Sequence, residues 1–152
     1  MEQAIHRELI MVDVDAKDAE DAIRQVGQLF LKNGYVKDTY IDAVVAREKV
    51  FATGLELEGI SIAMPHTDII HVNKPGVTVA KLKHPVEFEH MGEPGRKVQA
   101  EMLFMMAITN PEDQIGTITK VLGVFQNKEA LAAFKAAQSE DEVYEVASKY
   151  IG

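Results

Sequence analysis

The sequence predicts a single α/β domain, with some α+β character, in which a mixed central β-sheet is flanked by helices on both faces. The chain has 152 residues, of which 47% are hydrophobic and 26% charged, as is usual for one soluble globular domain. Strand-like patterns occupy its middle and helical patterns both ends, and no repeat or low-complexity linker separates them. We therefore treat residues 1–152 as one domain.

The first third of the chain predicts a strand followed by two helices. Residues 9–14 form a short apolar run with β-branched side chains. Apolar residues then recur at helical spacing over 18–32, and the Asn-Gly pair at 33–34 supplies a stop. We expect Asp38 to cap a second helix, which ends where residues 51–54 break the pattern.

The middle of the chain predicts the central sheet. Residues 59–64 read as a buried strand that ends abruptly at a proline. Strand periodicity returns over 77–84, followed by a short extended piece at 86–88. The polar, glycine-containing segment 90–97 predicts a hairpin connection. Residues 98–108 are almost all apolar, which is typical of a central strand covered on both faces.

The last third predicts three helices. Asn110 is placed to cap the first, because a proline and two acids follow it, and apolar residues continue the pattern to residue 125. A second helix is expected over 128–137. Ser139 and Glu142 have the spacing of a capping box and open the third helix.

Composition excludes several classes of function. The chain has no cysteine, which rules out a disulfide scaffold, a thiolate metal site and a cysteine nucleophile. Its net charge is −8 with no basic run, so phosphate backbones are repelled. No apolar run is long enough to cross a membrane, and residues 1–13 lack the pattern of a secretory signal. We expect a cytoplasmic protein that neither binds nucleic acid nor inserts into a membrane.

Because the chain has no cysteine, any soft-nucleophile or transition-metal chemistry must use its five histidines. His66 follows a proline that itself follows the apolar residues 62–64, so its ring is presented at the end of a rigid element. The same position is also typical of a turn histidine with no function.

Two other chemistries have weaker support. His66, Asp68 and His71 offer metal-binding groups for a metal-dependent hydrolase, but their spacing follows no common face and no further ligand stands out. No serine lies in a nucleophile elbow, and there is no glycine-rich phosphate loop. We therefore expect neither a metal nor another cofactor.

The segment Ile-Ala-Met-Pro-His at 62–66 resembles the phosphorylation-site signature of the enzyme IIA domains of the mannitol/fructose superfamily (type 2) of the sugar phosphotransferase system (PTS). The Ala-Arg-Glu-Lys segment at 46–49 is similar to an Arg-Glu element of that family, and the resemblance covers nearly the whole chain. The interval from Arg47 to His66 and the second histidine, His71, look most like galactitol-type members.

The sequence departs from the family pattern in two places. Glu58 and Thr67 stand where the pattern prefers an apolar and a small residue. Mannitol- and fructose-type members also have a second active-site histidine early in the helix after the long apolar strand. Residues 110–118 contain none, and Gln114 occupies that place, as in galactitol-type members.

The resemblance implies a phosphoryl relay. The histidine-containing phosphocarrier protein HPr would donate to His66, which would pass the group to a cysteine of a IIB component serving a IIC membrane permease. Arg47 would hold the phosphoryl oxygens and Gln114 would donate an amide hydrogen bond to them. His71 and Asp68 are candidates for orienting His66 by hydrogen bonds. The substrate would be a sugar or sugar alcohol, galactitol-like in type.

Alternatives remain at this stage. A regulatory IIA of the nitrogen-related type would use the same histidine as a signal for binding other proteins. A non-catalytic binding module would use His66 only structurally. Arg47, considered without the family, is an exposed helix arginine that could pair with Glu48 or Asp42.

Overall fold

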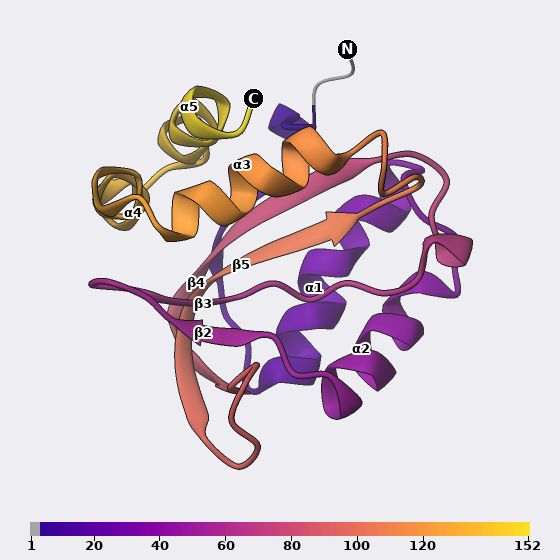
Figure 1. Ribbon diagram of the computed structural model, residues 1–152, viewed down its shortest axis with the longest axis horizontal. Helices are drawn as coiled ribbons and strands as arrows, with labels where there is room; N and C mark the ends of the chain where they lie inside the picture. The colour runs from indigo at the N-terminus through magenta and orange to yellow at the C-terminus, as the bar shows by residue number, and fades with distance from the viewer. Residues whose placement is uncertain (1–3) are drawn as a thin grey trace.

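The computed structural model describes residues 4–152; residues 1–3, part of the predicted domain, lie outside that range. A five-stranded sheet has the order β1-β4-β5-β3-β2 (Figure 1). It is mixed, because β1 pairs parallel with β4 and β3 with β5, whereas β4–β5 and β3–β2 are antiparallel. The strands are β1 Ile10–Val14, β2 Gly54–Glu56, β3 Ser61–Ala63, β4 Gly76–Glu89 and β5 Lys97–Ala107.

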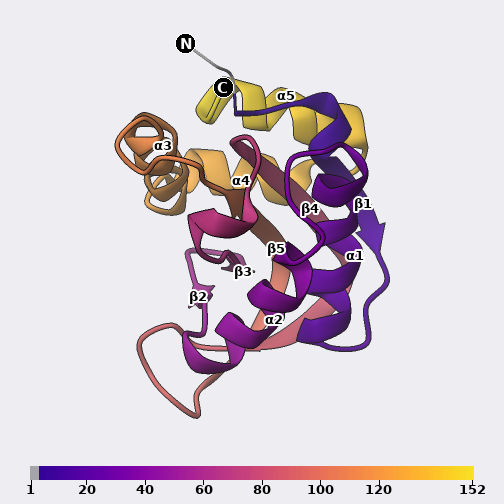
Figure 2. The ribbon, with the colours of Figure 1, turned by 90° about the vertical axis from the view of Figure 1, so that its right-hand side faces the viewer.

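Helices cover both faces of this sheet, as Figures 1 and 2 show from two sides. One face packs against α1 and α2, and the other against α3, α4 and α5. This arrangement confirms the predicted fold class. The helices are α1 Ala19–Lys32, α2 Tyr40–Val50, α3 Ile115–Phe125, α4 Lys128–Ala136 and α5 Glu140–Tyr150, with short 3-10 helices at Arg7–Leu9 and Ile69–His71.

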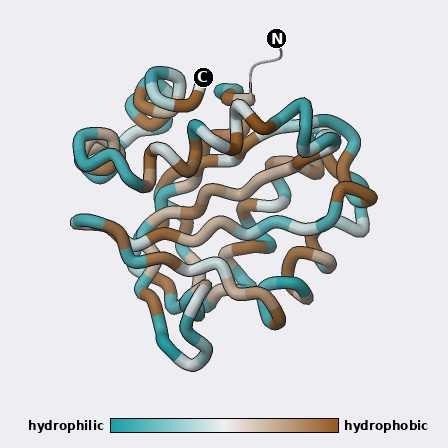
Figure 3. Tube along the Cα trace, in the orientation of Figure 1, coloured by the Kyte–Doolittle hydropathy of each residue, from teal (hydrophilic) through white to brown (hydrophobic). Residues whose placement is uncertain are grey.

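Strand β5 shows how the sequence builds two cores. Its alternate residues Met102, Phe104 and Met106 are buried on the side of α3, α4 and α5. Leu103 and Met105 are buried on the side of α1 and α2. Because successive side chains of a strand point to opposite faces, an unbroken apolar run is what a strand between two helix layers requires. In Figure 3 the central strands are mainly brown or pale, and teal gathers in the outer turns.

The sheet differs from the prediction in two places. β4 continues through Pro85, where we expected two separate strands, and its pairing with β5 shifts register between Lys81 and Val86. This irregularity lets the strand pass a residue that has no N–H to donate. β2 lies where the sequence predicted only a break. At three residues it is too short to show any periodicity.

Two helix starts also differ. α2 begins at Tyr40 with Thr39 as its N-cap residue, so the Asp38 cap is wrong. α3 begins at Ile115, because the predicted first turn after Asn110 forms a separate turn instead. The Asn110 side chain accepts a hydrogen bond from the Glu112 N–H within that turn. The capping box of α5 and the end of α1 at Asn33 are as the sequence indicates.

Within residues 4–152 we find no helix with the length and apolarity needed to cross a membrane.

Candidate functional site

His66 lies just beyond the carboxyl end of β3, on the sheet edge where the parallel strand β5 also ends. The preceding Pro65 is buried, and its carbonyl accepts the N–H of Met106 at 3.3 Å, which ties this segment to β5. Ligand sites of open α/β sheets often form at such edges. The rigid attachment that the Pro-His pair predicted is therefore present.

A hydrogen bond to the main chain sets the tautomer of His66. Its Nδ1 lies 2.9 Å from the carbonyl oxygen of Met64. A carbonyl can only accept, so Nδ1 must hold the proton in the neutral ring, and Nε2 on the other side keeps its lone pair. The imidazole is thus prepared as a nucleophile at Nε2.

His66 and Arg47 line the same cavity, of about 480 Å³. Its walls come from the last turn of α2, the loop that follows, the His66 segment and the turn between β4 and β5. Arg47 and His66, which the sequence predicted to act together, therefore line one cavity although they are far apart in the chain.

The guanidinium of Arg47 has few polar contacts. Its guanidinium carbon lies 4.8 Å from the centre of the Phe51 ring, and its Nη1 lies 3.8 Å from a carboxylate oxygen of Asp68. Its Nε is buried without a hydrogen-bond partner. Pairing of Arg47 with Glu48 or Asp42 is not what the structure shows, since Glu48 binds Thr53 and Asp42 binds Arg24. An unfilled guanidinium donor beside a histidine suits an anionic ligand.

The residues expected to orient His66 have other partners. The ring of His71 is 2.8 Å from the Thr39 hydroxyl, and Asp68 faces Arg47. The short 3-10 helix Ile69–His71 follows directly and leads the chain toward α2, where Thr39 lies. The Met64 carbonyl takes the role that the sequence assigned to these two side chains.

Gln114 lies on the same sheet edge but not in the lining of the His66 cavity. Its Oε1 accepts the backbone N–H groups of Thr109 at 3.0 Å and Asn110 at 2.8 Å. It lines a smaller pocket together with Ile108 and Thr117. The carboxamide oxygen is therefore occupied in shaping the turn before α3.

Two residues near His66, Thr53 and His90, were not predicted from the sequence. Thr53 is buried and binds both Glu48 and the Met64 N–H. His90, from the turn after β4, lines the cavity, and its Nδ1 accepts the N–H of Gly92. No periodic signal marks these contacts, because they join a helix end, a three-residue strand and a turn.

Gly54 explains how the β4–β5 turn reaches this site. A Cβ added at Gly54 would lie 2.7 Å from the carbonyl oxygen of Glu89. The N–H of Met91 donates to the Gly54 carbonyl at 2.9 Å. Only glycine permits so close a backbone approach. Among the described residues, no group of three or more His, Cys, Asp or Glu side chains is arranged to hold a metal ion.

Comparisons with known proteins show which family this chain resembles. The galactitol-specific EIIA component of the PTS in Escherichia coli (strain K12) is 25% identical over 134 residues, covering 88% of this chain and 88% of that protein. The mannitol-specific EIICBA component of Buchnera aphidicola (subsp. Acyrthosiphon pisum, strain APS) is 32% identical over 139 residues, or 84% of this chain and 22% of that longer protein.

Solved structures show the same fold. The complex of the mannitol enzyme IIA with phosphorylated enzyme IIB from Escherichia coli contains a chain that matches with a TM-score of 0.74 and 28% identity, covering 95% of this chain and 97% of that one. A family model described as "Phosphoenolpyruvate-dependent sugar phosphotransferase system, EIIA 2" matches residues 3–150. The predicted resemblance is confirmed, and the chain belongs to this EIIA 2 family of phosphoryl-transfer proteins.

Proposed function

We propose that this chain is a phosphocarrier that accepts a phosphoryl group from HPr on His66 and passes it to a cysteine of a IIB component. The observation that supports this most directly is the bond from Nδ1 of His66 to the Met64 carbonyl, which leaves Nε2 unbonded in a residue that lines one cavity with Arg47. A neutral imidazole of this kind is a competent nucleophile near pH 7.

The two transfer steps need no proton movement at His66. In the first, the Nε2 lone pair forms a bond to phosphorus while the N–P bond of phosphorylated HPr breaks and the HPr imidazole leaves with that electron pair. In the second, a IIB thiolate attacks phosphorus, and His66 leaves as a neutral ring. Nδ1 keeps its proton throughout, and the Met64 carbonyl stabilises the cationic phosphorylated ring.

Arg47 is the group placed to stabilise the charge in both steps. The equatorial oxygens of a loose phosphoryl-transfer transition state need fixed donors. The Nη1 of Arg47 makes only a long contact, 3.8 Å, to a carboxylate oxygen of the exposed Asp68. A phosphoryl group on His66 can replace that contact. Gln114, which is farther along the edge, stays a candidate for an additional amide hydrogen bond.

The surface around His66 suits protein partners. Large apolar side chains are exposed on the segments that flank the cavity and on the segment that follows His66: Val50, Phe51, Ile69, Ile70 and Met91. Exposed apolar groups around a polar site are typical of protein interfaces. The mannitol enzyme IIA, solved as a complex with phosphorylated enzyme IIB, supports a IIB component as the acceptor here.

We further propose that the chain acts in the cytoplasm and supplies a IIC permease that imports and phosphorylates a sugar or sugar alcohol. The galactitol-specific relative supports a substrate of that type.

Transfer of radioactive phosphate from phosphoenolpyruvate, through enzyme I and HPr, tests the proposal. The wild-type chain should gain an acid-labile, base-stable label, and His66→Ala should gain none while His71→Ala is labelled normally. A labelled His66→Ala protein would refute the site. A labelled chain that passes nothing to a IIB component would favour the regulatory alternative.

A further inference from the structure

The side chain of Glu48 joins the end of α2 to the loop that follows it. Its Oε2 accepts the backbone N–H of Thr53 and its Oε1 accepts the Thr53 hydroxyl, both at 2.8 Å. Thr53 is only 4% exposed, so without this acceptor two donors would be left unpaired away from water. The carboxylate therefore fixes both the backbone and the side chain of Thr53.

Thr53 in turn holds Met64, the residue whose carbonyl binds His66. Because its hydroxyl hydrogen is donated to Glu48, its oxygen is left to accept, and it accepts the N–H of Met64 at 3.2 Å. The carbonyl of Met64 accepts the Nδ1–H of His66 at 2.9 Å. Glu48 is thus linked to the imidazole through Thr53 and the backbone of Met64.

We propose that Glu48 is a positioning residue for His66, an inference that rests on the phosphocarrier function above. Through Thr53 it holds Met64 where the Met64 carbonyl keeps the proton on Nδ1 and leaves Nε2 free. The ionised carboxylate is the form that serves both Thr53 donors, since a protonated carboxyl has one oxygen that carries a hydrogen of its own. Glu48 touches neither the phosphoryl group nor the reacting nitrogen; it acts through Thr53.

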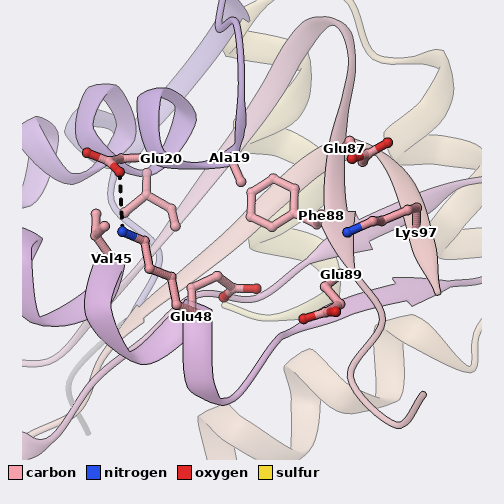
Figure 4. Close-up of a pocket in the computed structure, with 10 residues that line it drawn as sticks. Ala19, Glu20, Val45, Glu48, Glu87, Phe88, Glu89 and Lys97 are labelled. Carbon is pink, nitrogen blue, oxygen red and sulfur yellow. Dashed lines mark ion pairs between the residues drawn. The ribbon is translucent and has the colours of Figure 1, made fainter. Parts of the chain in front are cut away.

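The other side of Glu48 lines a second cavity, of about 290 Å³, shown in Figure 4. Ile23, Val45 and Phe88 give it apolar walls, and burial raises the pKa of Glu48 to about 7, although the Thr53 hydrogen bonds lower it. The charge of Glu89 raises it further. The charged groups around Glu48 in this cavity are Glu20, Lys49, Glu87, Glu89 and Lys97.

Two of these neighbours form an ion pair: the Nζ of Lys49 lies 3.8 Å from a carboxylate oxygen of Glu20, and a dashed line in Figure 4 marks this contact. His66 is absent from the lining of this second cavity. Glu48 itself lines this cavity and is absent from the lining of the His66 cavity, although Lys49 and Glu89 line both.

Two substitutions remove different members of the link between Glu48 and His66. Glu48→Gln keeps the shape but leaves one acceptor oxygen for two Thr53 donors. Thr53→Val keeps the shape but removes the hydroxyl. We expect each to slow kcat for phosphorylation of His66 by roughly tenfold, with the KM for phosphorylated HPr unchanged, because orientation is lost and docking is not. The double variant should be no slower than Thr53→Val alone.

A spectroscopic readout separates positioning from simple stability. In protein with ¹⁵N-labelled histidine, long-range ¹H–¹⁵N NMR at pH 8 should show His66 as a single Nδ1–H tautomer. Glu48→Gln and Thr53→Val should show a mixture of both tautomers. Thr53→Ser, which retains the hydroxyl, should restore the single tautomer and the wild-type rate.

The matched control is Glu87→Gln, which removes a charge from the same cavity but makes no bond to Thr53 and should change neither readout. Folded Glu48→Gln and Thr53→Val proteins with one Nδ1–H tautomer and wild-type kcat would overturn the proposal. If the wild type accepts no phosphoryl group, the phosphocarrier function fails, and the tautomer measurement still decides whether Glu48 positions the ring.

Discussion

Two segments follow parallel strands to the same edge of the sheet, and they use their polar side chains differently. After β3, His66 bonds to the main chain through Nδ1, which leaves its Nε2 unbonded. After β5, Gln114 uses its carboxamide oxygen on the N–H groups of Thr109 and Asn110. The segment after β3 leaves a ring nitrogen without a partner, whereas the segment after β5 uses its acceptor oxygen to stabilise its own turn.

The difference shows that the sheet edge determines where a residue lies, and that local hydrogen bonds determine what it can do. His66 lines a cavity with an arginine whose Nε has no partner. Gln114 lines a small pocket whose other walls are largely apolar. The comparison therefore predicts large effects from changes beside His66 and small effects at Gln114.

The largest expected effect is the change in folding stability with pH that arises from Glu48. Glu48 has a pKa of about 7 in the folded chain against 4.5 for the free group, so the folded state binds its proton more tightly. The free energy of unfolding therefore includes the full stabilisation from protonated Glu48 below about pH 4.5. This stabilisation, on the order of 3 kcal/mol, is lost as pH rises through 7. Urea unfolding across this range should show that slope in the wild type and in Glu87→Gln, and lose it in Glu48→Gln. An unchanged slope in Glu48→Gln would contradict the burial of this carboxyl.

Removal of the guanidinium beside His66 should have the next largest effect. Arg47→Ala should slow single-turnover transfer from phosphorylated HPr by about 100-fold, because a fixed donor for the transition-state oxygens is lost. Arg47→Lys keeps the charge without the fork of donors and should be intermediate. Rapid-quench measurement of the labelled chain gives both rates. Wild-type transfer by Arg47→Ala would remove this residue from the site.

The apolar surface around His66 should affect docking and leave chemistry unchanged. Val50 and Ile70 are 72% and 67% exposed. Changing both to serine should raise the KM for phosphorylated HPr by about tenfold, since apolar contact with the partner is lost, and leave kcat unchanged. Leu122→Ser on α3, also at an exposed apolar residue, is the control. An equal effect at Leu122 would mean that the docking surface lies elsewhere.

The smallest effect is expected at Gln114, where two substitutions separate its possible roles. If its oxygen only shapes the turn, Gln114→Ala should lower stability by about 1 kcal/mol and Gln114→Glu, which keeps an acceptor, should lower it less. If its amide also donates to the phosphoryl group, both variants should slow transfer by several-fold. Unfolding and transfer assays on the same two proteins decide between these outcomes.

Apolar periodicity predicted the parts of the fold that bury large surfaces. It located α1, α2, the central strand β5 and the capped helix α5. It failed at the turn after Asn110, where the Asn110 side chain bonds the Glu112 N–H, and at the start of α2, whose N-cap residue Thr39 makes no side-chain cap hydrogen bond. It also missed β2, which is only three residues long.

The same division holds for the candidate site. The Pro-His pair and the Arg-Glu pair were visible in the sequence, and the structure brings Arg47 and His66 to one cavity. The bonds that set their orientation were not visible. The hydrogen bond between Thr53 and Met64 joins residues eleven positions apart, and the one between Thr39 and His71 joins residues thirty-two positions apart. No periodic pattern in the sequence indicates either bond.

The most direct test of the account identifies the phosphorylated atom. ¹⁵N-histidine protein phosphorylated by HPr should show coupling between phosphorus and the Nε2 of His66, with Nδ1 still protonated. Phosphorus on Nδ1 would contradict the tautomer set by the Met64 carbonyl. Phosphorus on any other residue, or on none, would contradict the role of His66 itself.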